Sequence, residues 1–342
     1  MLIIRHLVVI AGHWGRTALM TPILVACAVA AMLEPWLPSP RAPLSTNLRG
    51  KRIVITGANA GVGKHAALRL AKQGAEVVLA CRNPSKAEAV RAEIEAASGT
   101  AAILRVDLLS FESVRAAARA LGGSPIDVLL LNAGTNANVP TLRHPDADCS
   151  TVFGVNFLAQ WLLLKLLART TVVRRVVCLG SVMHHVADIQ AVFEDRADYS
   201  ESKLAMILLA RDLDRGGGLF DDRIPAVAAN PGAVSTEIWR YTPAFARPLF
   251  DLVARSIFLT PDQGAATSVH AATCALPPAT DALYFAPYWQ PSLFPSAFEW
   301  FGPFSGGANI TYCRLPSNER AIASQLWRKC ESLCGSALSD PL

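Results

Sequence analysis

The chain has 342 residues, and its 32 Lys and Arg against 27 Asp and Glu give a formal net charge of +5. That charge is small and forms no dense basic tract, so a nucleic-acid-binding protein is excluded. Hydrophobic residues make up 52% and charged residues 17%, which excludes a disordered chain and allows one large α/β domain. The eight cysteines form no C-x-x-C pair and no Cys/His cluster with zinc spacing, so no metal site is expected.

The N-terminal segment is hydrophobic and contains no acidic residue before Glu34. Residues 17–33 are uncharged, and this length is at the short limit for a membrane-spanning helix, which needs about 20 residues. Three interpretations stay open: a membrane anchor, which we favour, a cleaved signal or transit peptide, and a hydrophobic helix packed on its own domain. An anchor would make the protein membrane-associated, for instance at the endoplasmic reticulum, whereas cleavage would leave the mature chain inside an organelle.

A Pro-rich run separates this segment from the rest of the chain and has the composition of a stiff linker. We therefore divide the sequence into a hydrophobic segment at 1–34, a linker at 35–49 and a single main domain at 50–335.

The main domain begins with a β-branched run at 52–56, which leads into a glycine-rich turn, a helical pattern and a second strand at 76–80. In such a βαβ unit, Gly57 permits a tight exit from the strand. Gly61 lets the backbone approach a pyrophosphate, and Gly63 lets the helix lie close to the strand. The free N–H groups at the start of the helix would then face the phosphates. The placement of the glycines predicts a dinucleotide-binding loop.

The second strand ends in Cys81-Arg82 and carries no acidic residue at the position that would bind the ribose hydroxyls of NAD. Arg82 could instead pair with a 2′-phosphate, and Lys64 adds positive charge beside the glycine turn. We therefore expect NADP(H) as the cofactor, with NAD(H) as the alternative.

Tyr199 and Lys203 are four residues apart on a predicted helix, which places them on one face. A phenol is a poor base at neutral pH, and a nearby ammonium should lower its pKa so that it can exchange a proton with a substrate oxygen. Ser181 follows a predicted strand at 175–179, at the edge where sites gather in parallel sheets. These residues predict acid–base chemistry next to the nucleotide.

Five motifs follow one another in a specific order. They are T-G-x-x-x-G-x-G from Thr56, N-A-G from Asn132, then Asn156, Ser181 and Y-x-x-x-K from Tyr199. In this order, over about residues 51–266, the chain resembles the short-chain dehydrogenase/reductase family. It is most similar to the retinol dehydrogenase and WW-domain oxidoreductase group, with no WW domain visible. Support for the group comes from the segments at 107–115, 181–185 and 260–265.

The resemblance implies an α/β fold with a doubly wound parallel sheet, the Rossmann fold, and a catalytic tetrad of Asn156, Ser181, Tyr199 and Lys203. It also implies a set of residues around the cofactor. They are Thr56, Gly57, Asn59, Gly61, Val62, Gly63, Arg82, Asp107, Leu108, Asn132, Ala133, Gly134, Tyr199, Lys203, Pro231, Gly232, Val234 and Thr236.

The function implied is that of an NADP(H)-dependent oxidoreductase that interconverts an alcohol and an aldehyde or ketone, on a small hydrophobic substrate such as a retinoid. A broad carbonyl reductase, a steroid dehydrogenase and a non-catalytic regulator are the alternatives, and a homodimer is left open. A substrate lid is expected at 237–258. The aromatic residues at 284–304 could line a pocket, a dimer contact or a membrane surface, or simply pack against the edge of the sheet. The chain departs from the group in its single serine at Ser181 and in Gln160-Trp161 after Asn156.

Overall fold

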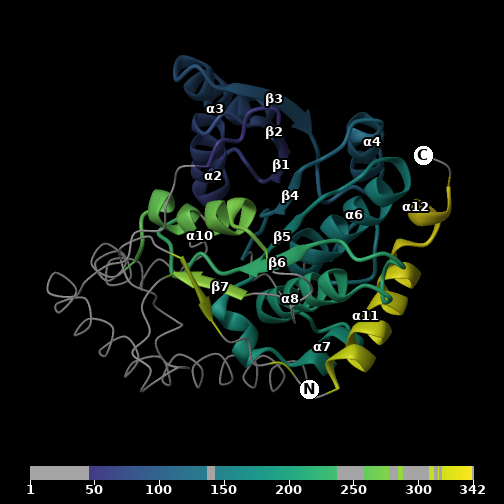
Figure 1. The fold of residues 1–342 in the computed structure, drawn as a ribbon. Coiled ribbons are helices and arrows are strands. Elements are labelled where there is room, and N and C mark those ends of the chain that lie inside the picture. Colours follow the sequence, from purple (N-terminus) through teal and green to yellow (C-terminus); the bar gives the residue numbers. More distant parts are fainter. Residues whose placement is uncertain are drawn as a thin grey trace, which may run out of the picture.

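The computed structural model describes residues 46–136, 143–236, 258–276, 284–287, 308–311, 315 and 318–340. Its centre is one sheet in the order β3-β2-β1-β4-β5-β6-β7-β8 (Figure 1). The chain leaves the β3 edge and returns to pair β4 with β1, which creates the switch point where doubly wound folds bind ligands. The strands are β1 (Arg52–Thr56), β2 (Glu76–Cys81), β3 (Thr100–Arg105), β4 (Val128–Leu131), β5 (Val176–Leu179), β6 (Ala226–Ala229), β7 (Tyr284–Pro287) and β8 (Ala308–Thr311).

The predicted doubly wound parallel sheet is confirmed for β1 to β7, which pair in parallel. The inner strands β1, β4, β5 and β6 are almost wholly buried, as expected for a sheet covered on both faces. The last strand differs from the expectation, because β8 pairs with β7 in the antiparallel direction. An antiparallel edge strand needs no crossover helix to join a parallel sheet.

Helices cover both faces of the sheet and bury two separate hydrophobic cores. One face carries α2, α3 and α10, and the other carries α4, α6, α8, α11 and α12 (Figure 1). The helices are α2 (Gly61–Lys72), α3 (Pro84–Ala96), α4 (Phe111–Leu121), α5 (Thr151–Phe153), α6 (Ala159–Thr170), α7 (Ile189–Phe193), α8 (Tyr199–Arg215), α10 (Pro261–Thr273), α11 (Glu319–Cys334) and α12 (Ser336–Ser339). Packing thus continues past residue 335, since Ala337 and Leu338 of α12 are buried.

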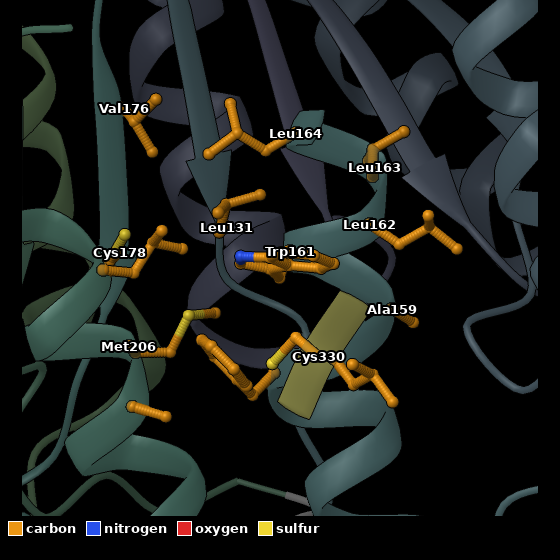
Figure 2. Close-up of a cluster of buried hydrophobic side chains, with 14 of the residues drawn as sticks. Leu131, Ala159, Trp161, Leu162, Leu163, Leu164, Val176, Cys178, Met206 and Cys330 are labelled. Carbon is orange, nitrogen blue, oxygen red and sulfur yellow. The ribbon is translucent and has the colours of Figure 1, made fainter. Parts of the chain in front are cut away.

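The helix predicted at 151–167 runs to Thr170 and is interrupted by a π-helical turn, η2 (Gly154–Leu158). Within the described residues, the stretch Thr151–Thr170 is apolar and long enough to cross a membrane, yet 78% of its most apolar window is buried. Figure 2 shows the reason, because Trp161 of α6 lies among side chains from β4, β5, α8 and α11. It is therefore a core helix of this domain.

Several predicted segments lie outside the described residues. They are the hydrophobic segment at 1–34, nearly all of the linker at 35–49, the lid at 237–258 except its last residue, and the aromatic stretch at 284–304 beyond β7.

Candidate active site

The predicted site residues all follow the carboxyl ends of parallel strands or begin the next helix. Because these ends share one edge of the sheet, residues far apart in sequence meet there. The placements are Thr56 at the end of β1, Arg82 after β2, Asp107 and Leu108 after β3, Asn132 to Gly134 after β4, Asn156 in η2, Ser181 after β5, Tyr199 and Lys203 in α8, and Pro231 to Thr236 after β6.

The glycine turn lies directly against the segment that follows β4. Gly57 has a φ of +67°, and a Cβ there would stand 2.9 Å from the Cα of Ala133. A Cβ on Gly63 would stand 2.4 Å from the Asn132 Nδ2 atom and 2.5 Å from the Gly57 carbonyl oxygen. These contacts leave no room for a side chain, so both glycines are required for the close approach of strand, turn and helix.

The N-terminus of α2 fits an anionic cofactor. Its N-cap residue, Ala60, offers no side-chain hydrogen bond and its first turn holds no acid, whereas Asn83, Ser110 and Thr260 cap the N-termini of α3, α4 and α10. The first N–H groups of α2 are therefore available to phosphate oxygens. Gly61 has a φ of +53°, and a Cβ there would make a tight contact of 3.2 Å with the Thr236 Cγ2 atom.

Arg82 and Asp107 lie further along the same edge, at the ends of β2 and β3. The Arg82 side chain is exposed and makes no recorded hydrogen bond or ion pair among the described residues. The Asp107 carboxylate accepts a hydrogen bond from the Leu109 backbone N–H at 3.1 Å, which fixes the turn after β3.

Tyr199 is the first residue of α8, and a capping box sets its position. The Asp198 side chain accepts a hydrogen bond from the backbone of the first turn, and Glu201 bonds back to the Asp198 N–H at 3.0 Å. Glu201 also accepts from the Asp188 N–H at 2.9 Å, which fastens the loop after Ser181 to the helix. This role of Glu201 was not predicted, although the Asp-x-x-Glu spacing at 198–201 is a recognisable signal.

The Ser181 and Tyr199 side chains lie within hydrogen-bonding reach of each other. Burial raises the pKa of the Tyr199 phenol above its ordinary value, and the Ser181 hydrogen bond opposes that shift. The Lys203 Nζ atom lies 5.6 Å from the centre of the Tyr199 ring. The phenol pKa is therefore raised in this structure, and the lowering expected from the ammonium is not found.

Lys203 is almost completely buried and donates a hydrogen bond to the Leu179 carbonyl oxygen at 2.9 Å. Burial lowers the pKa of its ammonium to about 8, because a charge is costly away from water. A Cβ placed on Gly134 would be 3.6 Å from both the Lys203 Nζ and the Asn156 Oδ1. The glycine after β4 therefore lies beside both groups, with room for ordinary van der Waals contact.

Asn156 lies in the π-helical turn and is fully buried. Its Oδ1 accepts from the Thr135 N–H at 2.7 Å, and its Nδ2 donates to the Thr135 carbonyl at 3.0 Å and to the Ser202 hydroxyl at 3.2 Å. Ser202 in turn donates to the Tyr199 carbonyl at 2.7 Å. Ser202 thus links Asn156 to the catalytic helix, a role that the sequence analysis did not assign.

The segment after β6 closes the other side of the site. The Asn230 side chain accepts from the Gly232 N–H at 2.9 Å and so shapes the turn that holds Pro231. A Cβ on Gly264 would collide with Val234 at 2.5 Å, so α10 packs directly on this turn. Thr236, the last described residue of this segment, lies beside Gly61 of the glycine turn.

His184 and His185 follow Ser181 in the 3-10 turn η3 (Val182–Val186), with ring centres 3.9 Å apart. The His184 Nδ1 atom lies 2.6 Å from the Ser181 carbonyl oxygen, and burial lowers the pKa of this imidazole to about 4. In the described part of the chain, no group of three or more His, Cys, Asp or Glu residues could hold a metal ion. The pair therefore shapes the loop that carries Ser181.

Comparison with known proteins places this geometry in one family. The family model for short chain dehydrogenases matches residues 51–246. The chain is 32% identical to Mus musculus retinol dehydrogenase 14 over 280 residues, which cover 74% of this chain and 82% of that protein. It is 35% identical to Bos taurus dehydrogenase/reductase SDR family member 13 over 260 residues, covering 70% and 67% of the two chains.

Two solved structures also align with this chain. A crystal structure of an uncharacterized protein from Mycobacterium paratuberculosis aligns with a TM-score of 0.63 at 27% identity, covering 86% of this chain and 97% of that one. A short chain dehydrogenase from Burkholderia cenocepacia in complex with NADP aligns with a TM-score of 0.52 at 26% identity, covering 67% and 93%.

Proposed function

The chain belongs to the short-chain dehydrogenase family and is an oxidoreductase of alcohols and carbonyl compounds, and we propose that it uses NADP(H) on a small hydrophobic substrate such as a retinoid. Relatives named retinol dehydrogenase, from mouse and from human, support the retinoid part of this proposal. Support for NADP(H) comes from Arg82, which is exposed at the end of β2 where an NAD-binding chain would carry an acid.

In the proposed reaction, the nicotinamide supplies or accepts the hydride, which is chemistry that no side chain of this protein provides. Tyr199 donates its phenolic proton to the substrate oxygen during carbonyl reduction and takes a proton during alcohol oxidation. Ser181 hydrogen-bonds the same oxygen. Lys203 places a positive charge behind the phenol, and Asn156 fixes the adjoining turn after β4.

The observation that carries the proposal is the buried cluster of Ser181, Tyr199 and Lys203. Among the described residues, Lys203 has no carboxylate partner and bonds only a backbone carbonyl, so its burial is costly for folding. Tyr199 and Lys203 also belong to the expected cofactor set, but a chain that only bound a nucleotide would gain nothing from the Ser181 hydroxyl beside the phenol. The cluster therefore favours an enzyme over a non-catalytic regulator.

The test is turnover by the full chain in detergent micelles, with retinal, steroid ketones and simple aromatic aldehydes as substrates. We expect oxidation of NADPH to exceed that of NADH, and Tyr199→Phe to lower kcat by about a hundredfold or more while cofactor binding is kept. Preference for steroid ketones or simple aldehydes would support the steroid dehydrogenase or carbonyl reductase alternative. Preference for NADH would overturn the role of Arg82. Tight NADPH binding without turnover would favour a regulator.

Membrane association through residues 1–34 is a further part of the proposal, with the endoplasmic reticulum as the compartment to examine first. It is supported by the absence of acidic residues before Glu34 and by the uncharged run at 17–33. The full chain should stay in the membrane pellet after alkaline carbonate extraction. Release of a full-length chain would contradict an anchor, and a shortened mature chain would indicate cleavage.

A further inference from the structure

Gln160 is a buried polar residue to which the reaction described above gives no role. It is the second residue of α6, one helical turn after Asn156, and its side chain is 0% exposed. A polar group in such a place is costly unless it is fully hydrogen-bonded. Its partners therefore indicate what it does.

The Gln160 amide joins three separate segments of the active site. Its Nε2 donates to the Asn156 carbonyl oxygen at 2.7 Å and to the Ala133 carbonyl oxygen at 3.0 Å. Its Oε1 accepts from the Thr56 hydroxyl at 2.6 Å. One side chain thus connects the strand end before the glycine turn, the segment after β4 and the turn that carries Asn156.

The hydrogen bonds of the Thr56 hydroxyl determine which end of the Gln160 amide faces Thr56. The Thr56 hydroxyl oxygen accepts from the backbone N–H groups of Asn132 at 2.9 Å and Ala133 at 3.0 Å, which uses both lone pairs. Its proton must then be donated, and the Gln160 Oε1 is closer than the other acceptor, the Leu130 carbonyl at 3.4 Å. A reversed amide would point an oxygen at two carbonyl oxygens. The observed orientation is the one that satisfies every group.

The contact with Asn156 falls inside an irregular part of the backbone. In the π-helical turn, the Ala159 N–H bonds to the Gly154 carbonyl, five residues back, instead of the four of an α-helix. The Gln160 side chain supplies a donor to the Asn156 carbonyl within this widened turn. It therefore holds the turn in the register that aims the Asn156 side chain at Thr135 and Ser202.

We propose that Gln160 is a positioning residue that ties the π-helical turn of Asn156 to Thr56 and Ala133 at the cofactor end of the site. Through this bridge the proton-transfer residues and the glycine turn keep one relative position. The inference rests on the proposed function for its kinetic consequence, but its structural consequence can be measured without turnover.

The test compares Gln160→Met with Leu164→Met. Methionine nearly keeps the shape of glutamine and removes every hydrogen bond, whereas Leu164, one turn further along α6 and also 0% exposed, receives the same side chain without losing one. We expect Gln160→Met to lower kcat by about tenfold or more and to change the KM for NADPH far less. Amide hydrogen exchange in Gly154–Leu158 should become faster. Leu164→Met should leave kcat and this exchange unchanged.

The outcomes separate the inference from the proposed function. If the wild type turns over with dependence on Tyr199, while Gln160→Met keeps the wild-type kcat and only melts at a lower temperature, the bridge is structural and the inference is wrong. If the wild type shows no turnover, the proposed function fails. Faster hydrogen exchange of Gly154–Leu158 in Gln160→Met would then still support the positioning role of Gln160, and unchanged exchange would overturn it. Should Gln160→Met not fold, Gln160→Asn replaces it, since its shorter amide cannot span Thr56 and Asn156 together.

Discussion

At the residue scale, burial is the largest cause of the pKa shifts of both Tyr199 and Lys203. Burial raises the pKa of Tyr199 and lowers the pKa of Lys203 to about 8, so both groups are pushed toward their neutral forms. At neutral pH the phenol therefore carries its proton while most of the lysine is still charged. A protonated phenol is the form that donates a proton during reduction of a carbonyl.

The titration of Lys203 gives a pH dependence with a defined sign. Its charge is present below the folded-state pKa and is lost as the pH rises through about 8. We therefore expect kcat for NADPH-dependent reduction to fall as the pH rises through this range, measured from about pH 6 to about pH 10. Lys203→Arg is the matched variant, because a guanidinium stays charged throughout. Any activity that it keeps should show no decline near this pH. A wild-type profile that is flat or rises across this range would contradict the argument.

At the element scale, the fold could be predicted where the signal is local. A β-branched run predicted β1, and further strands were predicted where β2 and β5 lie. The glycine turn with α2 followed from the placement of the glycines between a strand and a helical pattern. The Tyr199–Lys203 spacing correctly predicted one face of α8, since four residues make one helical turn.

Features that depend on tertiary packing could not be predicted. The apolar pattern at 151–167 indicates a helix, but one additional residue in a single turn does not change that pattern, so η2 stayed hidden. The hydrogen bond between Thr56 and Gln160 joins positions 104 residues apart, and the hydrophobic pattern within one helix or strand gives no information about such a contact. The direction of β8 likewise depends on how the chain returns to the edge of the sheet.

At the scale of the whole molecule, helix α11 supports the active site from outside. Trp327 of α11 is 5% exposed, and its ring stacks on Phe157 of η2 with centroids 6.2 Å apart. Its Nε1 donates to the Asp212 carboxylate of α8 at 3.0 Å. Glu319, at the start of α11, pairs with Arg211 of α8 at 3.1 Å. The end of the chain therefore holds together the π-helical turn and the catalytic helix, two elements that supply catalytic residues.

This arrangement predicts that Trp327 stabilises the entire domain. Trp327→Ala should lower the free energy of unfolding by about 3–5 kcal/mol, because it removes a large buried ring and leaves a cavity beside Phe157. Urea unfolding followed by far-UV circular dichroism measures the change. Arg328→Ala is the control, since Arg328 is the exposed neighbour on the same helix and should change stability by less than about 0.5 kcal/mol. A loss below about 1 kcal/mol for Trp327→Ala would mean that α11 lies on the domain without supporting it.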